Sequence, residues 1–208
     1  WGRLVNFKAN HRKVLIADDG HGGLVGLVTS ANPHDASSAH SNVAMRLAGP
    51  ALQPLLWSEI RVARFSGWKT DLSPALHAAL DAPAPPQPAD AQRSFVAGRT
   101  IHARMLTEGG IRDALLEKLA AAGHGDQIDI AMFYLSDRDV IDALLAASRR
   151  GAEVRLLLDP NKDAFGHQKD GVPNRPVATE LFAASDGAIR VRWYRTHGEQ
   201  FHSKLAMI

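Results

Sequence analysis

Asn10-His11-Arg12-Lys13-Val14-Leu15-Ile16-Ala17-Asp18 near the start of the chain shares a pattern with Phe201-His202-Ser203-Lys204-Leu205-Ala206-Met207 near its end. Each stretch carries His-x-Lys followed by an apolar run. The first closes with Asp18, five residues after Lys13, and the second reaches Ile208, one residue before the position of its acid. A chance match to His-x-Lys-x4-Asp in a chain this long has a probability on the order of a few per cent. The second His-x-Lys therefore indicates a repeated functional motif.

The first motif opens a predicted β-hairpin. Residues 13–17 are mostly apolar, as expected for a strand buried on both faces. Residues 18–23 are rich in Asp and Gly and predict a turn, and residues 24–28 return as the paired strand. Antiparallel pairing would place His11, before one strand, beside Asn32, just beyond the other.

The remaining chain alternates between strand and helix patterns. In the first half we expect strands at 4–8 and 42–47 and a helix at 49–65, with Trp57, Phe65 and Trp68 in the core. In the second half we expect strands at 100–106, 128–134, 154–158, 189–194 and 201–207, and helices from 111 to 123, from the cap Ser136 to Gly151, and at 178–184. This alternation predicts an α/β fold with right-handed crossovers.

A change of composition divides the chain. Between Ala82 and Asp90 there are four prolines in six residues, which favours an extended connector. We therefore expect a first lobe at residues 1–81, a Pro-rich linker at 82–92 and a second lobe at 93–208.

Length and charge narrow the function classes. The chain has 208 residues, enough for two cores, and no cysteine, which excludes disulfides and thiolate metal sites. No apolar run approaches the roughly 18 residues of a membrane span. The net charge is only +2, and each half of the chain is close to neutral. A dedicated nucleic-acid binder usually carries a basic stripe, so this class is disfavoured. His34, Asp35 and His40 lack metal-ligand spacing and are interpreted as solvated loop residues.

The paired motifs resemble those of the phospholipase D superfamily, whose members carry two His-x-Lys-x4-Asp motifs, one in each lobe of a pseudo-twofold fold. Thr29-Ser30-Ala31-Asn32 is similar to the family's Gly-Ser-x-Asn element, with Thr in place of Gly. The resemblance implies a two-lobed α/β phospholipase D-like fold, each lobe a mixed sheet flanked by helices. It also implies a piece of a longer protein, with the first lobe truncated at its N-terminus and the second at its C-terminus.

Two His and two Lys supply what cleavage of a phosphodiester needs, namely a nucleophile, an acid and positive charge around the phosphoryl oxygens. The resemblance implies that neither a metal nor a cofactor takes part. It assigns His11 as the nucleophile that forms a phosphohistidine and His202 as the acid for the leaving alcohol, with the exchanged roles left open. It assigns Lys13 and Lys204 to the phosphoryl oxygens.

Two further residues complete the implied site. Asn32 would add a neutral donor, and Asp18 would hold the first motif without reacting. Many relatives place an acid before the Asn that starts the next strand, where it orients a catalytic His, but here Ser41 precedes Asn42. The partner that orients this His is therefore open.

The resemblance to bacterial phospholipase D and cardiolipin synthase-like proteins implies a metal-independent phosphodiesterase or phosphatidyltransferase. Its partner would be a phospholipid, with contact to a membrane surface. Two alternatives stay open: a nuclease of the same superfamily, with nucleic acid as substrate, and an inactive relative that only binds phosphate. The sequence leaves open the acceptor alcohol, the oligomeric state and the location, and the resemblance is compatible with a membrane-associated or a secreted bacterial protein.

Overall fold

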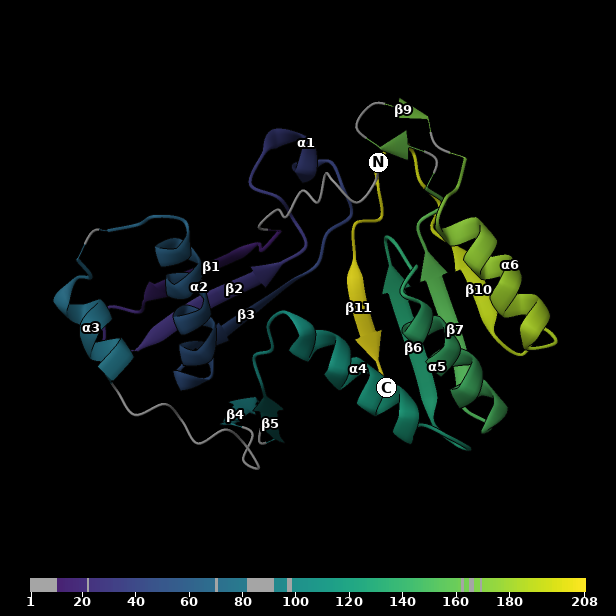
Figure 1. The fold of residues 1–208 in the computed structure, drawn as a ribbon, viewed down its shortest axis with the longest axis horizontal. Helices are drawn as coiled ribbons and strands as arrows, with labels where there is room; N and C mark the ends of the chain where they lie inside the picture. Colours follow the sequence, from purple (N-terminus) through teal and green to yellow (C-terminus); the bar gives the residue numbers. More distant parts are fainter. Residues whose placement is uncertain are drawn as a thin grey trace.

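The computed structural model describes residues 11–21, 23–69, 71–81, 92–96, 99–161, 163–164, 167–168 and 170–208. Its elements form two parts, each with a β-sheet beside helices (Figure 1), which confirms the predicted α/β class. The strand predicted at 4–8 and residues 82–91 of the predicted linker lie outside the described residues. The division into lobes at 1–81 and 93–208 stays a prediction.

The first part is a three-stranded sheet with helices on one side. Its elements are β1 (Val14–Asp18), β2 (Leu24–Thr29), α1 (Asp35–Ser38), β3 (Ala44–Ala48), the 3-10 helix η1 (Pro50–Leu52), α2 (Gln53–Phe65) and α3 (Pro74–Asp81). The strands pair antiparallel in the order β1-β2-β3, and Val14 opposes Val28. The predicted hairpin is thus confirmed. Of the mixed sheets expected in both lobes, this one is antiparallel throughout its described strands.

Close packing between β2 and η1 closes the core of the first part. Leu52 is fully buried over Gly26, where an added Cβ would come within 2.7 Å of Leu52 Cδ2. On α2, Leu56 and Ile60 are buried and pack against Leu24 of β2, among other apolar residues. Burial of this stripe fixes α2 against the sheet that carries the first motif.

The prediction of three core aromatics is wrong for two of them. Trp57 is half-buried against the α2 cluster, but Phe65 is 94% exposed and Trp68 is 37% exposed. Phe65 lies five residues beyond the buried Ile60, so a helical period of 3.6 turns it well away from the buried stripe. Trp68 follows the end of α2.

The second part has a larger, mixed sheet. Its elements are β4 (Gln92–Val96), β5 (Arg99–Ala103), α4 (Gly109–Ala121), β6 (Gln127–Met132), α5 (Arg138–Arg149), β7 (Glu153–Leu158), β8 (Asp163–Ala164), β9 (His167–Gln168), α6 (Asn174–Ala184), β10 (Arg190–Trp193) and β11 (Lys204–Met207). The order is β10-β7-β6-β11, with β10, β7 and β6 parallel and β11 antiparallel. The pairs β4-β5 and β8-β9 are separate hairpins. The expected strand at 100–106 ends at Ala103.

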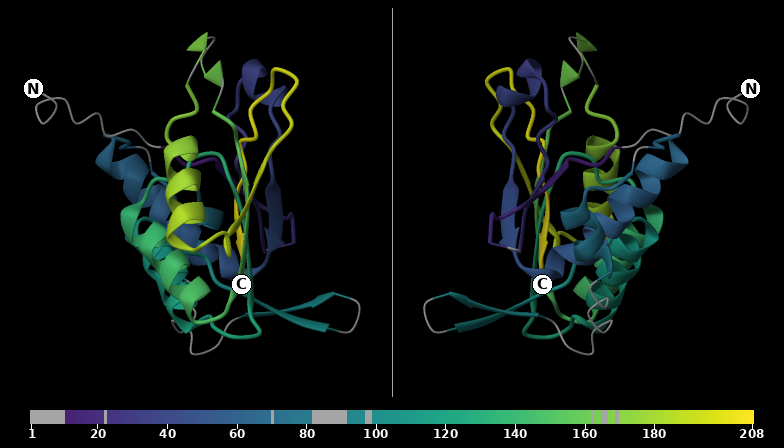
Figure 2. Two further views of the ribbon diagram at one scale, coloured as in Figure 1. Left: turned by 90° about the vertical axis from the view of Figure 1, so that its right-hand side faces the viewer. Right: turned by 90° about the vertical axis from the view of Figure 1, so that its left-hand side faces the viewer.

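Helices cover one face of this mixed sheet, as the edge-on views in Figure 2 show. Along β7, Val154, Leu156 and Leu158 are buried, while Glu153 and Arg155 are exposed. The strand follows the alternation of a sheet with one packed face. Charged pairs such as Arg155–Asp129, 2.6 Å apart, occupy the other face.

Asp137, and not Ser136 as predicted, caps the start of α5. Its backbone is extended and its carboxylate accepts a hydrogen bond from the Val140 N–H at 3.1 Å. The side chain of an Asp at this position satisfies an N–H that has no partner within the helix. The helix then buries Val140, Ile141 and Leu144 in the core of the second part.

The two parts meet through backbone hydrogen bonds between the loop before β3 and the segment before β11. Ser41 N–H donates to the Gln200 carbonyl and His202 N–H donates to the Ser41 carbonyl, each at 2.9 Å. Arg12 adds ion pairs with Glu108 across the junction and with Glu59 of α2, the latter at 2.7 Å. This junction places the start of β1 near the start of β11.

Candidate active site

Both His-x-Lys motifs lie at this junction. His11 and Lys13 occupy the extended segment before β1, and the Thr29 N–H donates to the Lys13 carbonyl at 3.0 Å, which continues the hairpin pairing toward the site. His202 precedes β11 and Lys204 is its first residue. The strand predicted at 201–207 begins at Lys204, three residues later than expected, so His202 lies before the strand.

His202 is buried and held by contacts from both parts of the chain. It is 7% exposed, and its Nδ1 lies 2.8 Å from the backbone carbonyl oxygen of Ser30. The Phe133 ring meets it edge-on at 4.9 Å, and the His40 ring lies 6.3 Å away. A carbonyl oxygen only accepts hydrogen bonds, so Nδ1 carries the proton and Nε2 keeps a lone pair.

This carbonyl is the orienting partner that the sequence left open. The position where relatives carry an acid is Ser41, whose own backbone carbonyl accepts the His202 N–H. The Ser30 carbonyl is fixed in turn, because Ser30 Oγ donates to Asn42 Oδ1 at 3.1 Å and accepts from the Val43 N–H at 3.0 Å. The neutral Ser30 carbonyl therefore takes the orienting role that a carboxylate has in many relatives.

Burial lowers the pKa of His202 to about 4, and the positive charge of Lys204 acts in the same direction. The hydrogen bond to Ser30 opposes this shift, and Lys13 and His40 add to it. Among the residues that the structure describes, no carboxylate pairs with this ring to offset the shift. The ring is therefore neutral over the physiological pH range.

His11 has the opposite arrangement of ring protons. It is exposed, and its Nδ1 lies 3.0 Å from Lys13 Nζ. An ammonium only donates, so Nδ1 accepts and Nε2 carries the proton. Burial, followed by the charges of Lys13 and Lys204, lowers the pKa of His11 below its ordinary value.

The two lysines concentrate positive charge between the motifs. Lys13 Nζ donates to the His11 carbonyl at 2.8 Å, and Lys204 Nζ donates to the His202 carbonyl at 3.0 Å. Burial and then the charge of Lys13 lower the pKa of Lys204 to about 8. Within the part of the chain that the structure describes, neither ammonium pairs with a carboxylate. An anion bound here would relieve this repulsion.

Charges act across the two motifs. Lys204 lowers the pKa of His11, and Lys13 lowers the pKa of both His202 and Lys204. Side chains from positions nearly 200 residues apart therefore share one electrostatic environment. This arrangement can bind a phosphate, offer one imidazole lone pair and offer one imidazole N–H.

The two other predicted site residues lie at different places. Asn32 is half-buried, and its N–H donates to Ser37 Oγ at 2.8 Å in the loop that carries Ser30. Asp18 ends β1 at the far end from His11, and its Oδ1 accepts from the Gly20 N–H at 3.1 Å. The structure brings Asn32 to the junction loop and places Asp18 in the hairpin turn.

Sequence reasoning missed a buried polar network beneath the second motif. Asp159, 2% exposed, accepts from the Phe201 N–H at 2.6 Å and from the Asn161 N–H at 2.6 Å. Asn174, fully buried, accepts from the Leu135 N–H and donates to the Asp159 carbonyl at 2.9 Å. The signal in the sequence is Asp-Pro-Asn at 159–161, directly after a buried strand. The network fixes the backbone next to His202.

A known family matches the second half of the chain. Residues 115–208 match the model of the family described as cardiolipin synthase, PLD-like domain. The matched range includes His202 and Lys204. Residues 115–208 belong to the phospholipase D superfamily. Membership supports a phosphodiesterase or phosphatidyltransferase function. No curated protein and no solved structure matched the chain.

The described residues contain neither a metal cluster nor a membrane-spanning helix. Among the residues that the structure describes, no group of three or more His, Cys, Asp or Glu side chains could hold a metal ion. No helix in the same residues is long and apolar enough to cross a membrane.

Asp159→Ala should lower the free energy of unfolding by about 2–4 kcal/mol, because it leaves two buried N–H groups without their acceptor. Asp113→Ala, an exposed position on α4, is the matched control and should change stability by less than about 0.5 kcal/mol. Urea unfolding followed by circular dichroism measures both. Equal stability of the two variants would contradict a structural role for the network.

The His202 ring should titrate with a midpoint near pH 4 in NMR spectra, identified by the signal that His202→Asn removes. Lys204→Met should raise this midpoint, because removing a nearby positive charge favours the imidazolium. Lys118→Met, on the exposed face of α4, is the control and should leave it unchanged. A midpoint near the ordinary value of about 6.5 would contradict the described burial and charge.

Proposed function

We propose that this protein is a metal-independent phosphodiesterase or phosphatidyltransferase that acts on phospholipids through a phosphohistidine. The observation that carries the proposal is the complementary protonation of two histidines from different motifs. His202 offers a lone pair at Nε2 and His11 offers an N–H at Nε2, with two ammonium groups in the same site. These are the groups that in-line displacement at phosphorus requires.

The hydrogen bonds favour His202 as the nucleophile, which exchanges the roles first assigned from the sequence. Its Nε2 attacks phosphorus, a P–N bond forms, and the bond from phosphorus to the leaving oxygen breaks. The proton stays on Nδ1, which keeps donating to the Ser30 carbonyl, and this hydrogen bond stabilises the positive charge that develops on the ring. A buried ring held by one hydrogen bond and by Phe133 is also pre-oriented for attack.

His11 then acts as the acid. Its Nε2 proton passes to the leaving oxygen, and Lys13, 3.0 Å from Nδ1, supplies a proton to the other nitrogen, so that the ring stays neutral. The lowered pKa of Lys13, caused by burial, eases this transfer. In the second step Nε2 of His11 takes a proton from water or an alcohol, Lys13 regains its own, and the incoming oxygen displaces His202 from phosphorus.

Trapping the intermediate tests this assignment. With a phosphodiester whose leaving group is p-nitrophenolate, the first step needs no acid. His11→Gln should therefore release a burst of about one equivalent of nitrophenol and retain a phosphoryl group on His202, because the second step has lost its base. His202→Gln, the matched variant, should show no burst. Rapid quenching at alkaline pH and peptide mass mapping locate the phosphoramidate.

The location of the label decides between mechanisms. A phosphoryl group on His11 in the His202→Gln variant would restore the original assignment and contradict the exchanged one. No label on either histidine, with turnover intact in the unmodified protein, would contradict the covalent route.

Surface character supports a lipid substrate. The chain carries a net charge of only +2 and no basic run interleaved with aromatic residues, whereas binding to nucleic acid draws on several phosphate contacts. Partly exposed apolar side chains flank the site residues in sequence: Val43 follows the junction loop, Tyr134 follows Phe133, and Leu205 follows Lys204. They offer an apolar approach for acyl chains.

A side-by-side assay tests the substrate class. The full-length protein should hydrolyse or transfer phosphatidyl groups on phosphatidylglycerol or phosphatidylcholine vesicles at physiological salt, and excess chelator should leave the rate unchanged. It should show little cleavage of single- or double-stranded DNA. The His202→Gln variant is the background control. DNA cleavage without lipid turnover would replace the lipid proposal with a nuclease.

A further inference from the structure

His40 is a third histidine at the junction of the two parts, and it belongs to neither His-x-Lys motif. It lies in the loop between α1 and β3, and the centre of its ring is 6.3 Å from that of the His202 ring. The sequence predicted a solvated loop residue. The side chain is instead half-buried and hydrogen-bonded to the segment before β11.

The His40 ring accepts a hydrogen bond from the backbone of the segment that carries His202. The Gln200 N–H donates to His40 Nδ1 at 3.2 Å. A backbone N–H only donates, so Nδ1 carries no proton and the neutral ring has its proton on Nε2. This hydrogen bond therefore exists only while His40 is uncharged.

Other acceptors hold the two backbone N–H groups that follow. The Phe201 N–H donates to Asp159 of the second part at 2.6 Å, and the His202 N–H donates to the Ser41 carbonyl of the first part at 2.9 Å. The first part thus holds this segment through the Ser41 carbonyl and the His40 ring.

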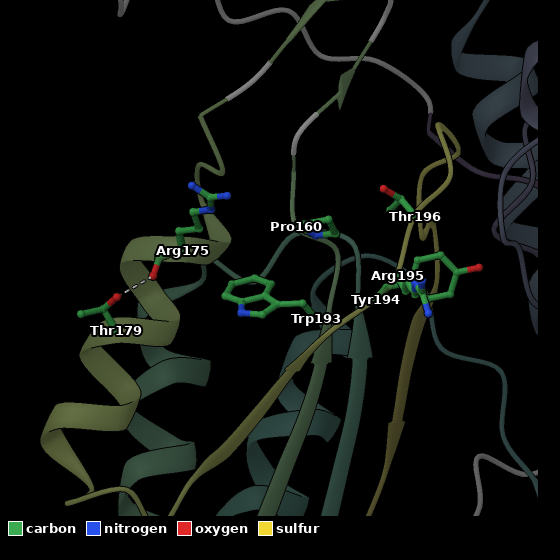
Figure 3. Close-up of a pocket in the computed structure, with 7 residues that line it drawn as sticks. All are labelled: Pro160, Arg175, Thr179, Trp193, Tyr194, Arg195 and Thr196. Carbon is green, nitrogen blue, oxygen red and sulfur yellow. Dashed lines mark hydrogen bonds between the residues drawn. The ribbon is translucent and has the colours of Figure 1, made fainter.

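Ring packing attaches the same segment to the second part. The Phe201 ring stacks on Tyr194, with centroids 4.6 Å apart and an angle of 11° between the ring planes. Tyr194 lines a pocket beside α6 (Figure 3). Because Phe201 is fixed in this way, the hydrogen bond from Gln200 to His40 ties a segment of the second part to the first.

The backbone of His40 is itself fixed by the network that orients the His202 ring. The His40 N–H donates to the Ser37 carbonyl at 3.1 Å, and Asn42 Nδ2 donates to the His40 carbonyl at 3.0 Å. Asn42 Oδ1 also accepts from Ser30 Oγ, and the Ser30 carbonyl accepts from His202. One loop therefore positions both the His202 ring and the backbone before it.

Few charged groups surround His40. From the segment before β11, the titratable neighbours are His202 and Glu199, and the Glu199 carboxylate accepts a backbone N–H of its own loop at 2.7 Å. From its own loop they are His34 and Asp35, both exposed. Among the described residues no carboxylate forms an ion pair with His40. A positive charge on His40 would therefore act on His202 without a counter-ion.

Protonation of His40 opposes attack by His202 in two ways. Burial is the largest cause of the lowered pKa of His202, and a charge on His40 acts in the same direction, as do the two site lysines. The same charge disfavours the positive charge that develops on His202 during attack. A protonated His40 also cannot accept the Gln200 N–H, so the segment before the nucleophile loses one of its ties.

We propose that His40 is a positioning residue of this site: the neutral ring holds the segment that carries the nucleophile, and protonation of the ring slows the first step. The inference rests on the proposed function, in which His202 attacks phosphorus. His40 takes no part in bond making and exchanges its proton with solvent. Its contribution is present while the ring is neutral and is lost as the pH falls.

The pH profile of the first step tests this role. With the p-nitrophenyl phosphodiester, the rate of the nitrophenol burst is measured from about pH 5 to pH 8 in samples quenched in alkali. The rate of the unmodified full-length protein should fall roughly tenfold or more toward the acidic end. His40→Asn should keep its rate within about twofold, because the amide oxygen can accept the Gln200 N–H and gains no proton. His40→Ala should be roughly tenfold slower even at the upper end.

His34→Asn is the matched control, because His34 is an exposed histidine of the same loop. Its pH profile should match that of the unmodified protein. An acidic fall in rate that is equally large in His40→Asn and in the unmodified protein would overturn the inference. So would a His40→Asn variant that folds normally and is as slow as His40→Ala at every pH.

NMR tests the same contact without turnover. The amide signal of Gln200 should shift with the same midpoint as the His40 ring signals, and His40→Asn should abolish this shift. The His202 midpoint, near pH 4, should rise in His40→Asn because a nearby positive charge is gone. Independent titration of Gln200 and His40 would overturn the inference. Coincident titration in a protein without phosphodiester turnover would support the anchoring contact and remove the proposed function.

Discussion

The hydrogen bond between His202 Nδ1 and the Ser30 carbonyl, 2.8 Å long, joins the two parts of the chain at the point where both motifs meet. It fixes the tautomer and the orientation of the buried ring. It depends on the junction backbone, where Ser41 pairs with Gln200 and His202, and on Asn42, which holds Ser30. The lone pair offered to a substrate at Nε2 therefore depends on the packing of one part against the other.

The positive groups of the site repel one another and are partly desolvated, and a bound phosphate would offset both effects. Burial lowers the pKa of both histidines and both lysines, and neighbouring cations lower the pKa of His11, His202 and Lys204 further. Lys204 is exposed overall, but its ammonium is partly desolvated, because Nζ lies 5.3 Å from the centre of the Phe133 ring and donates to the His202 carbonyl. An anion placed between these groups favours their charged forms.

The fold illustrates how far local patterns reach. The β1–β2 hairpin and the stripe of α5 were predictable because periodicity and turn residues act within about ten residues. The exposure of Phe65 was not predictable, because the residue type shows that the side chain is apolar but not whether its position on α2 faces the sheet. The predicted cap of α5, Ser136, was one residue too early. The cap is Asp137, because the backbone conformation decides which of the two side chains reaches the first turn.

The sequence by itself determined which side chains carry the chemistry, since two His-x-Lys motifs name two imidazoles and two ammonium groups. It also determined the α/β class, through the alternation of strand and helix patterns. Only the tertiary structure decided which histidine presents a lone pair. The tautomer depends on a backbone carbonyl 172 positions away in the chain, and a backbone carbonyl has no signature in the sequence. The same holds for Asp159, because its burial beneath the second motif arises only when the chain is packed.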